Sequence, residues 1–99
     1  MKLTKRSISG TLESSDIMIT LESSADGKNH IVLNSSVEKQ FGDSIRYTIN
    51  KTLTDFNISN AYLSAIDKGA LDCIIVARLK AAIYHSVSDE DKQSEVFKI

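Results

Sequence analysis

The chain has 99 residues, with 12 Lys and Arg against 13 Asp and Glu, so its formal net charge is -1. This length supports one hydrophobic core, which predicts a single domain over residues 1–99. A near-neutral chain is a poor fit for a nucleic-acid binder that neutralises phosphates. The longest apolar run, residues 73–77, is far shorter than a membrane helix. Cys73 is the only cysteine, which excludes an internal disulfide and favours a reducing, cytoplasmic setting.

Three short strands are predicted in the first third of the chain, where apolar and polar residues alternate with a period of two. In the first of them, Ile8 and Leu12 mark the apolar face. Residues 13–16 separate it from the second strand and can close a tight hairpin. An Asp26-Gly27 pair predicts the next turn. The predicted strands cover residues 7–13, 16–22 and 30–34.

Two amphipathic helices follow, separated by a fourth alternating strand over residues 61–66. Ser35 and Glu38 have the spacing of a capping box, which predicts the start of the first helix. Apolar residues then recur at steps of three or four in each helix. The first stripe comprises Val37, Phe41, Ile45, Ile49, Leu53 and Phe56, and its helix runs to about Asp55; the second comprises Leu71, Ile74, Ile75, Leu79, Ala82 and Ile83, in a helix from Ala70 to near His85.

The predicted order of elements is β-β-β-α-β-α. Because each helix has one apolar stripe and the strands have one apolar face, both helices are expected to pack on the same side of the sheet. The sequence therefore predicts an α+β fold, a two-layer sandwich of a mostly antiparallel four-stranded sheet and two helices. Residues 1–5 and 86–99 are expected to be loosely ordered, as chain ends commonly are.

Neither a catalytic set nor a metal site is predicted. His30, His85 and Cys73 are the soft metal ligands of the chain, and their separations match no zinc-site spacing. We expect His30 to lie at the surface and Cys73 to be a small, partly buried helix residue. The carboxylate pairs are expected to be exposed and solvated rather than tuned for acid–base work. These pairs are Glu13 with Asp16 and Asp89 with Asp91.

Serine is abundant, with 14 in the chain, so no serine stands out by rarity. Ser14 and Ser15 are distinctive by position, because the centre of a tight turn exposes its side chains. Serine at a turn position with positive φ costs on the order of 1 kcal/mol, which glycine avoids. From pattern alone, the pair is interpreted as a polar turn.

Three blocks of the sequence form a specific combination. They are Gly10-Thr11-Leu12-Glu13-Ser14-Ser15-Asp16 with Met18-Ile19, then Asn34-Ser35-Ser36-Val37-Glu38-Lys39-Gln40-Phe41-Gly42-Asp43, and Asp67-Lys68-Gly69-Ala70-Leu71-Asp72-Cys73-Ile74, which Ala77-Arg78-Leu79 extends. In their order and spacing these blocks resemble the acyl carrier protein of citrate lyase, its gamma subunit, over nearly the whole chain. The usual fatty-acid carrier is instead an acidic helical bundle with an Asp-Ser-Leu motif, which this chain lacks.

The resemblance implies a site at the first serine of the turn. Ser14 would carry a covalently attached group, 2'-(5''-phosphoribosyl)-3'-dephospho-coenzyme A, through a phosphodiester to its hydroxyl. The family commonly has Gly at the next position, where this chain has Ser15, so a second hydroxyl lies beside the first. Glu13 and Asp16 flank the site, and we expect their charges to repel the phosphates of the arm and help to hold the arm away from the domain.

The resemblance also implies a division of labour among subunits. An alpha subunit, the acyl transferase, would exchange citrate for acetate on the thiol of the arm. A beta subunit, the citryl lyase, would cleave the citryl thioester to oxaloacetate with Mg²⁺ and regenerate the acetyl thioester. This chain would only carry the thioester in the cytoplasm, after a separate enzyme has attached the arm.

Other functions remain open at this point. The chain fits the corresponding carrier of malonate decarboxylase, which uses the same type of arm, although the block at residues 67–74 favours citrate lyase. It also fits an unmodified binding or assembly domain. A small stand-alone enzyme is the least favoured class, because the sequence offers no acid–base pair.

Overall fold

The computed structural model of the chain describes residues 1–97. Within them lie four strands and two helices in the predicted order β-β-β-α-β-α. The elements are β1 (Ser7–Gly10), β2 (Ile17–Ser23), β3 (His30–Ser35), α1 (Glu38–Asp55), β4 (Ala61–Asp67) and α2 (Asp72–Ser86), followed by the 3₁₀ turns η1 (Asp91–Gln93) and η2 (Glu95–Phe97). No helix in the described part of the chain has the length and apolar character needed to cross a membrane.

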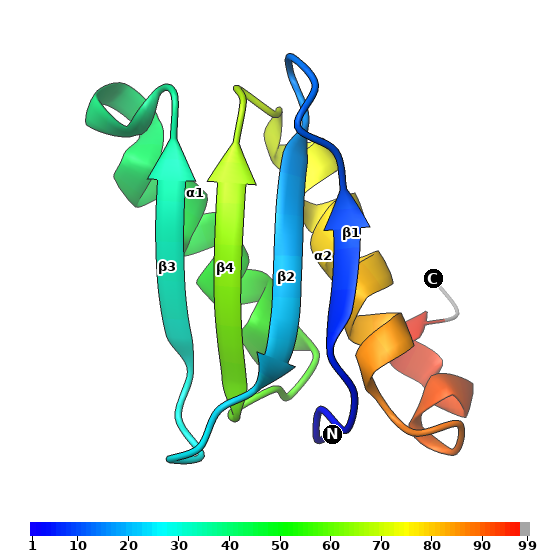
Figure 1. Ribbon diagram of the computed structural model, residues 1–99. Coiled ribbons are helices and arrows are strands. Elements are labelled where there is room, and N and C mark those ends of the chain that lie inside the picture. Colours follow the sequence, from blue (N-terminus) through cyan, green and yellow to red (C-terminus); the bar gives the residue numbers. More distant parts are fainter. Residues whose placement is uncertain (98–99) are drawn as a thin grey trace.

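The four strands form one mixed sheet in the order β1-β2-β4-β3 (Figure 1). β2 pairs antiparallel with β1 and with β4, whereas β3 pairs parallel with β4. The parallel pair arises because α1 carries the chain from the end of β3 back to the start of β4, as a parallel connection requires. The prediction of a mostly antiparallel sheet is confirmed, and the structure adds that β4 lies between β2 and β3.

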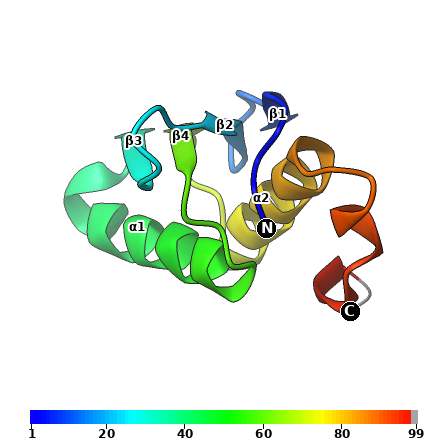
Figure 2. The ribbon, with the colours of Figure 1, turned by 90° about the horizontal axis from the view of Figure 1, so that it is seen from below.

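Both helices cover the same face of the sheet, which confirms the predicted two layers (Figure 2). Alternate residues of β2 and β4 point toward the helices and are buried, as the period of two predicts. The core between the layers includes Ile17, Ile19, Leu21, Leu63 and Ala65 from the sheet, and Ile49, Leu53, Ile75, Leu79 and Ile83 from the helices. The other face of the sheet is open, and Ile8, Val32 and Tyr62 are exposed.

The first strand buries the face opposite to the predicted one. Ser7 pairs with Leu21 and is buried, whereas Ile8 is exposed. The Ser7 hydroxyl donates to the carbonyl of Ala82 at 2.7 Å and lies 2.6 Å from the hydroxyl of Ser86, so the buried oxygen is hydrogen-bonded. Alternation in a short strand does not say which face meets the core, because pairing with the neighbouring strand sets the register.

The predicted capping box at the start of α1 does not form. Ser35 ends β3, and its hydroxyl donates to the Asp67 carboxylate at 2.8 Å and accepts the N–H of Val37 at 3.1 Å. The helix begins at Glu38 with Val37 at its N-cap and no side-chain cap. The hydroxyl that would have capped the helix instead ties the end of β3 to the end of β4.

Both ends of the described chain contact the core. Leu3 and Val87 are buried in the core cluster, and the backbone N–H groups of Thr4 and Lys5 both donate to the carbonyl of Ser86. Loose order over residues 1–5 and 86–99 stays a prediction, and residues 98 and 99 of that range lie outside the described residues.

Candidate functional site

The loop between β1 and β2, residues 11–16, projects from one end of the sheet (Figure 1). β1 ends at Gly10 rather than near residue 13, because the chain turns there with a φ of 95°. A Cβ at this position would lie 1.8 Å from the carbonyl oxygen of Ile17, so only glycine fits. Leu12, predicted in the strand, is therefore an exposed loop residue.

A tight turn over residues 13–16 forms the tip of this loop. The N–H of Asp16 donates to the carbonyl of Glu13 at 3.2 Å, and the third residue, Ser15, has a φ of 65°. Positive φ at the third position is the pattern of a type II turn, where glycine is preferred. A turn forms at the predicted residues, but it lies within the 11–16 loop instead of closing a tight hairpin, because the strand pairing ends at Gly10 and Met18. The strain expected of serine in such a turn falls on Ser15, at about 1–2 kcal/mol.

The two serines at the tip differ in how they are held. Both are exposed. The N–H of Ser15 donates to the carbonyl of Lys68 at 2.9 Å, and the N–H of Lys68 donates to the carbonyl of Asp16 at 2.9 Å. Ser14 forms no hydrogen bond to any part of residues 1–97. Backbone hydrogen bonds of Ser15 and Asp16 with Lys68 thus fix the tip, while the Ser14 hydroxyl is exposed and forms no hydrogen bond within residues 1–97.

Asp16 anchors the loop to α2 through Arg78, contrary to the prediction that its carboxylate is solvated. It is 8% exposed and accepts both guanidinium hydrogen bonds of Arg78, from Nε at 3.0 Å and from Nη2 at 2.8 Å. The Thr11 hydroxyl donates to it at 2.6 Å and the N–H of Ile17 at 2.7 Å. The Arg78 hydrogen bonds, followed by those from Thr11 and Ile17, hold the pKa of the Asp16 carboxyl well below its usual range.

This geometry alters the expectation that Glu13 and Asp16 both repel an arm. The Asp16 charge is matched by Arg78, so it holds the loop in place rather than projecting a free negative charge. Glu13 remains exposed beside Ser14. Sequence reasoning missed the Asp16–Arg78 pair because the partners stand 62 positions apart.

A second buried carboxylate, Asp67, shapes the turn next to the loop. It is 1% exposed and accepts the Ser35 hydroxyl and the N–H groups of Gly69 and Ala70 at 3.1 and 3.0 Å. These bonds hold residues 68–71 in an extended turn, so α2 begins at Asp72 instead of residue 70. The carbonyl of Lys68 is consequently presented to Ser15.

The remaining candidate groups lie apart from this loop. His30, at the start of β3, is exposed as expected and bonds Asp26 at 2.8 Å. His85 lies near the end of α2 and is exposed. Cys73 lies in the first turn of α2 and is exposed, so the expectation that it is partly buried is wrong. Residues 1–97 contain no group of three or more His, Cys, Asp or Glu side chains arranged to hold a metal ion.

Comparison with known proteins identifies the family of the chain. A family model described as "ACP: Malonate decarboxylase delta subunit (MdcD)" matches residues 4–86. A "Citrate lyase acyl carrier protein" of Latilactobacillus sakei is 50% identical over 91 residues, covering 92% of this chain and 89% of the relative. The chain belongs to the citrate lyase acyl carrier protein family. The resemblance inferred from the three sequence blocks is thereby confirmed.

Other acyl carrier proteins of this family support the same assignment. A "Citrate lyase acyl carrier protein" of Oenococcus oeni is 48% identical over 92 residues, covering 93% of this chain and 94% of the relative. One from Pectobacterium carotovorum is 40% identical over 95 residues, covering 96% and 98%. No solved structure was found to match. As expected, the chain is a carrier subunit and not an enzyme in its own right.

The blocks that carry the family resemblance meet at one end of this acyl carrier fold. The Gly10–Asp16 block supplies the loop, the block at 67–74 supplies the turn that bonds Ser15, and Arg78 reaches back to Asp16. Ser35, from the remaining block, bonds Asp67. Segments far apart in the sequence therefore build one structure around Ser14.

Proposed function

We propose that this carrier subunit holds its acyl group on a prosthetic arm joined to the Ser14 hydroxyl through a phosphodiester. The observation that carries the proposal is the contrast within the tip: the surrounding backbone is fixed, while Ser14 is exposed and makes no hydrogen bond within residues 1–97. A carrier needs an accessible hydroxyl on a rigid platform, because tethering raises the effective concentration of the acyl group at each partner site.

The arm proposed is 2'-(5''-phosphoribosyl)-3'-dephospho-coenzyme A, which supplies a terminal thiol that carries the acyl group as a thioester. The open surroundings of Ser14 fit a bulky group, because the tip projects from the sheet and its neighbours Glu13 and Ser15 are also exposed. Attachment would join the hydroxyl oxygen of Ser14 to a phosphorus of an activated precursor of the arm, a phosphoric anhydride. The anhydride P–O bond at that phosphorus would break, its phosphate portion would leave, and the hydroxyl proton would pass to a base of the attaching enzyme. Arg78 and Asp16 hold the loop in place throughout.

Ser14 is favoured over Ser15 on physical grounds. Ser15 adopts a left-handed conformation, and its N–H is bound to Lys68, so its backbone is part of the anchor. Modification of Ser15 would attach a bulky group to a residue with a strained backbone, and the hydrogen bond from this residue to Lys68 holds the turn in place. Ser14 precedes it without either constraint.

The proposed partners are an alpha subunit with acyl transferase activity, a beta subunit with citryl lyase activity and an enzyme that attaches the arm. The reaction served is cleavage of citrate to acetate and oxaloacetate, in the cytoplasm. Support comes from the naming of relatives at 40–50% identity as citrate lyase carriers. A reducing compartment agrees with a chain whose only cysteine is an exposed thiol.

Intact-mass spectrometry on protein from citrate-fermenting cells of the native host tests the proposal. The chain should exceed its bare mass of 10.9 kDa by one arm plus any acyl load, and fragmentation should place the addition on Ser14. Ser14→Ala should abolish the addition, and the matched Ser15→Gly variant should keep it. An unmodified chain from these cells would refute the carrier function, and an addition on Ser15 would refute the site alone.

A carrier for malonate decarboxylase is the second candidate, because the matching family model bears that description. Reconstitution separates the two. The modified chain should support citrate cleavage when combined with the alpha and beta subunits of citrate lyase. Support of malonate decarboxylation without citrate cleavage would reverse the order of the candidates.

A further inference from the structure

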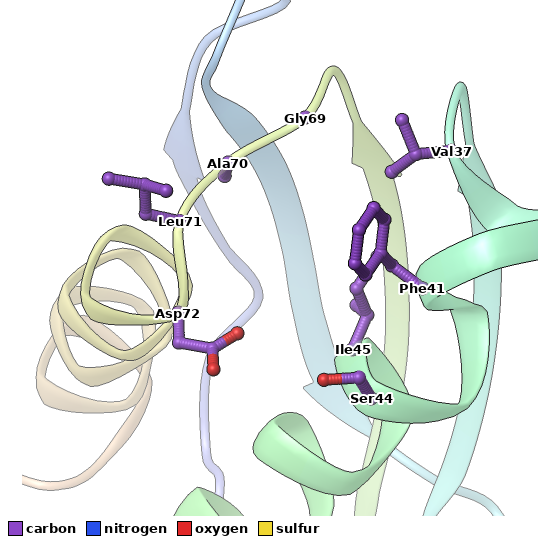
Figure 3. A pocket seen from close by; sticks show the side chains of 8 residues that line it. All are labelled: Val37, Phe41, Ser44, Ile45, Gly69, Ala70, Leu71 and Asp72. Atoms are coloured by element: carbon purple, nitrogen blue, oxygen red, sulfur yellow. The ribbon is translucent and has the colours of Figure 1, made fainter.

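An apolar groove lies between the first half of α1 and the turn that leads from β4 into α2. It encloses about 370 Å³ and is lined by Val37, Phe41, Ser44, Ile45, Gly69, Ala70, Leu71 and Asp72. In Figure 3, Val37, Phe41 and Ile45 face Gly69 and Ala70 across the gap, while Leu71 points away at the rim. Phe41 is 50% exposed and Leu71 is 70% exposed, so the groove leaves large apolar side chains uncovered.

The groove begins where the Ser14 loop is attached. Ser15 and Asp16 bond both backbone groups of Lys68, and Lys68 directly precedes Gly69, which lines the groove. The residue that anchors the loop and a residue that lines the groove are therefore adjacent along the chain. The 11–16 loop that bears Ser14 and the turn between β4 and α2 lie at the same end of the sheet (Figure 1), so a flexible group joined to Ser14 starts at the end where the groove lies.

The polar groups of the groove indicate which part of such a group it accepts. Figure 3 shows the Asp72 carboxylate and the Ser44 hydroxyl turned toward each other across the gap. Among residues 1–97, no Lys or Arg lines the groove. A negative carboxylate disfavours phosphate, whereas it accepts hydrogen bonds from amide N–H groups. Apolar walls with a few polar groups are typical of sites for small, mostly neutral ligands.

We propose that the groove docks the neutral, amide-containing segment of the arm carried by Ser14, with its thioester end, between transfer events. The proposal rests on the proposed function, because it requires an arm on Ser14. The nucleotide phosphates remain outside, away from Asp72. The docked arm covers Phe41 and limits the access of water and nucleophiles to the thioester.

Comparison of chemical shifts between apo and modified protein by NMR tests the docking. Attachment should shift the resonances of Phe41, Ile45 and Ala70 as well as those of the 11–16 loop. Phe41→Ala removes one wall and keeps a good helix former, so it should abolish the groove shifts. Tyr47→Ala is the matched control, because Tyr47 is an exposed aromatic residue of α1 that does not line the groove. It should leave the shifts intact.

Cleavage of the acetylated arm by hydroxylamine provides a second readout. If about two thirds of the arms are docked, cleavage is about threefold slower in the natural sequence and in Tyr47→Ala than in Phe41→Ala. Shifts confined to residues 11–16, with equal cleavage rates, would overturn the docking while leaving the arm on Ser14 intact. Groove shifts that arise only when a partner subunit is added would assign the groove to that partner and also overturn it. Absence of the arm by mass is a different result, because it removes the proposed function itself.

Discussion

Two polar loops of this protein are anchored at different places, and the contrast explains why only one is suited to present a reactive group. In the loop at residues 24–29, the ends are fixed: Ser24 donates to the carbonyl of Asn60, and the Asn29 side chain bonds Ile58 and Ala61. Its tip holds Gly27 at positive φ and Asp26, which pairs with the exposed His30 at the start of β3. In the loop at 11–16, the tip itself is fixed, through Asp16 and Ser15.

The position of the anchor determines what the tip can do. At the tip of the 24–29 loop, Asp26 bonds only near neighbours along the chain, the N–H of Lys28 and the ring of His30. A tip bonded to α2 and to the β4–α2 turn keeps its place relative to the core, even though it includes a strained serine. The second arrangement combines a fixed backbone with the exposed hydroxyl of Ser14.

The largest expected difference between the loops concerns their glycines. Gly10→Ala forces a Cβ against the Ile17 carbonyl at a φ of 95°, and it should lower the free energy of unfolding by about 2–5 kcal/mol. Gly27→Ala meets nothing within 4 Å and should cost only about 1–2 kcal/mol for its positive φ. Urea denaturation measures both. Equal losses would show that Gly10 is not held against Ile17 in solution.

Removal of the ion-pair partners is expected to have the next largest effect. Arg78→Ala leaves the buried Asp16 charge without its main partner, so it should lower the melting temperature by several degrees and slow modification of Ser14. His30→Ala removes the partner of the exposed Asp26 and should change both measurements little. If Arg78→Lys restores the melting temperature and not the modification rate, the two-point guanidinium contact positions the loop. Similar results for Arg78→Ala and His30→Ala would contradict the contrast.

The pH dependence of stability should reveal the same difference. The pKa of Asp16 is lower in the folded chain than its unfolded value of about 3.9, so its stabilising effect is present above that pH and is lost as the pH falls. Asp16→Asn should therefore flatten the acid limb of the stability curve and destabilise the protein most at neutral pH. Asp26, whose pKa is lowered chiefly by the N–H of Lys28 and then by His30, is the control. Asp26→Asn should have a smaller effect, and an equal effect would contradict the special role of Asp16.

The smallest expected effect comes from exchanging the residues with positive φ. Ser15→Gly relieves the left-handed serine and should raise the free energy of unfolding by about 1 kcal/mol. Gly27→Ser should lower it by a similar amount. Calorimetry gives both values, and mass spectrometry should show unchanged modification of Ser14 in Ser15→Gly. Loss of modification there would mean that the Ser15 side chain takes part in the site.

Much of the fold was predictable because it depends on local periodicity. The steps of three and four that place Ile45, Ile49 and Leu53 on one stripe gave α1 with its end at Asp55, and alternation gave β2 and β4. The local pattern did not predict which face of β1 is buried, because contacts with residues distant in the sequence determine it. Ser7 is buried because it pairs with Leu21 and bonds Ala82, and neither contact is visible in its own neighbours along the chain.

The candidate site divides in the same way. The turn and its serines were visible in four consecutive residues, and the family resemblance singled out Ser14. The support beneath them was not visible. From the sequence, Asp16 was predicted to be a solvated carboxylate, but in the fold it accepts a hydrogen bond from Arg78. Ser35 was predicted to cap α1, but its hydroxyl donates to Asp67 instead. Hydrogen-bonding groups with more than one possible partner are settled by tertiary structure, which a single sequence does not reveal.

The packing of the N-terminal segment has a practical consequence for handling the protein. Met1 lies at the end of the sheet opposite the 11–16 loop, and Leu3 fixes the segment in the core (Figure 1). A tag or surface linker joined at Met1 therefore leaves from the far end of the molecule. Protein immobilised in this way presents Ser14 and the groove outward, so binding of partner subunits can be measured without obstruction by the support.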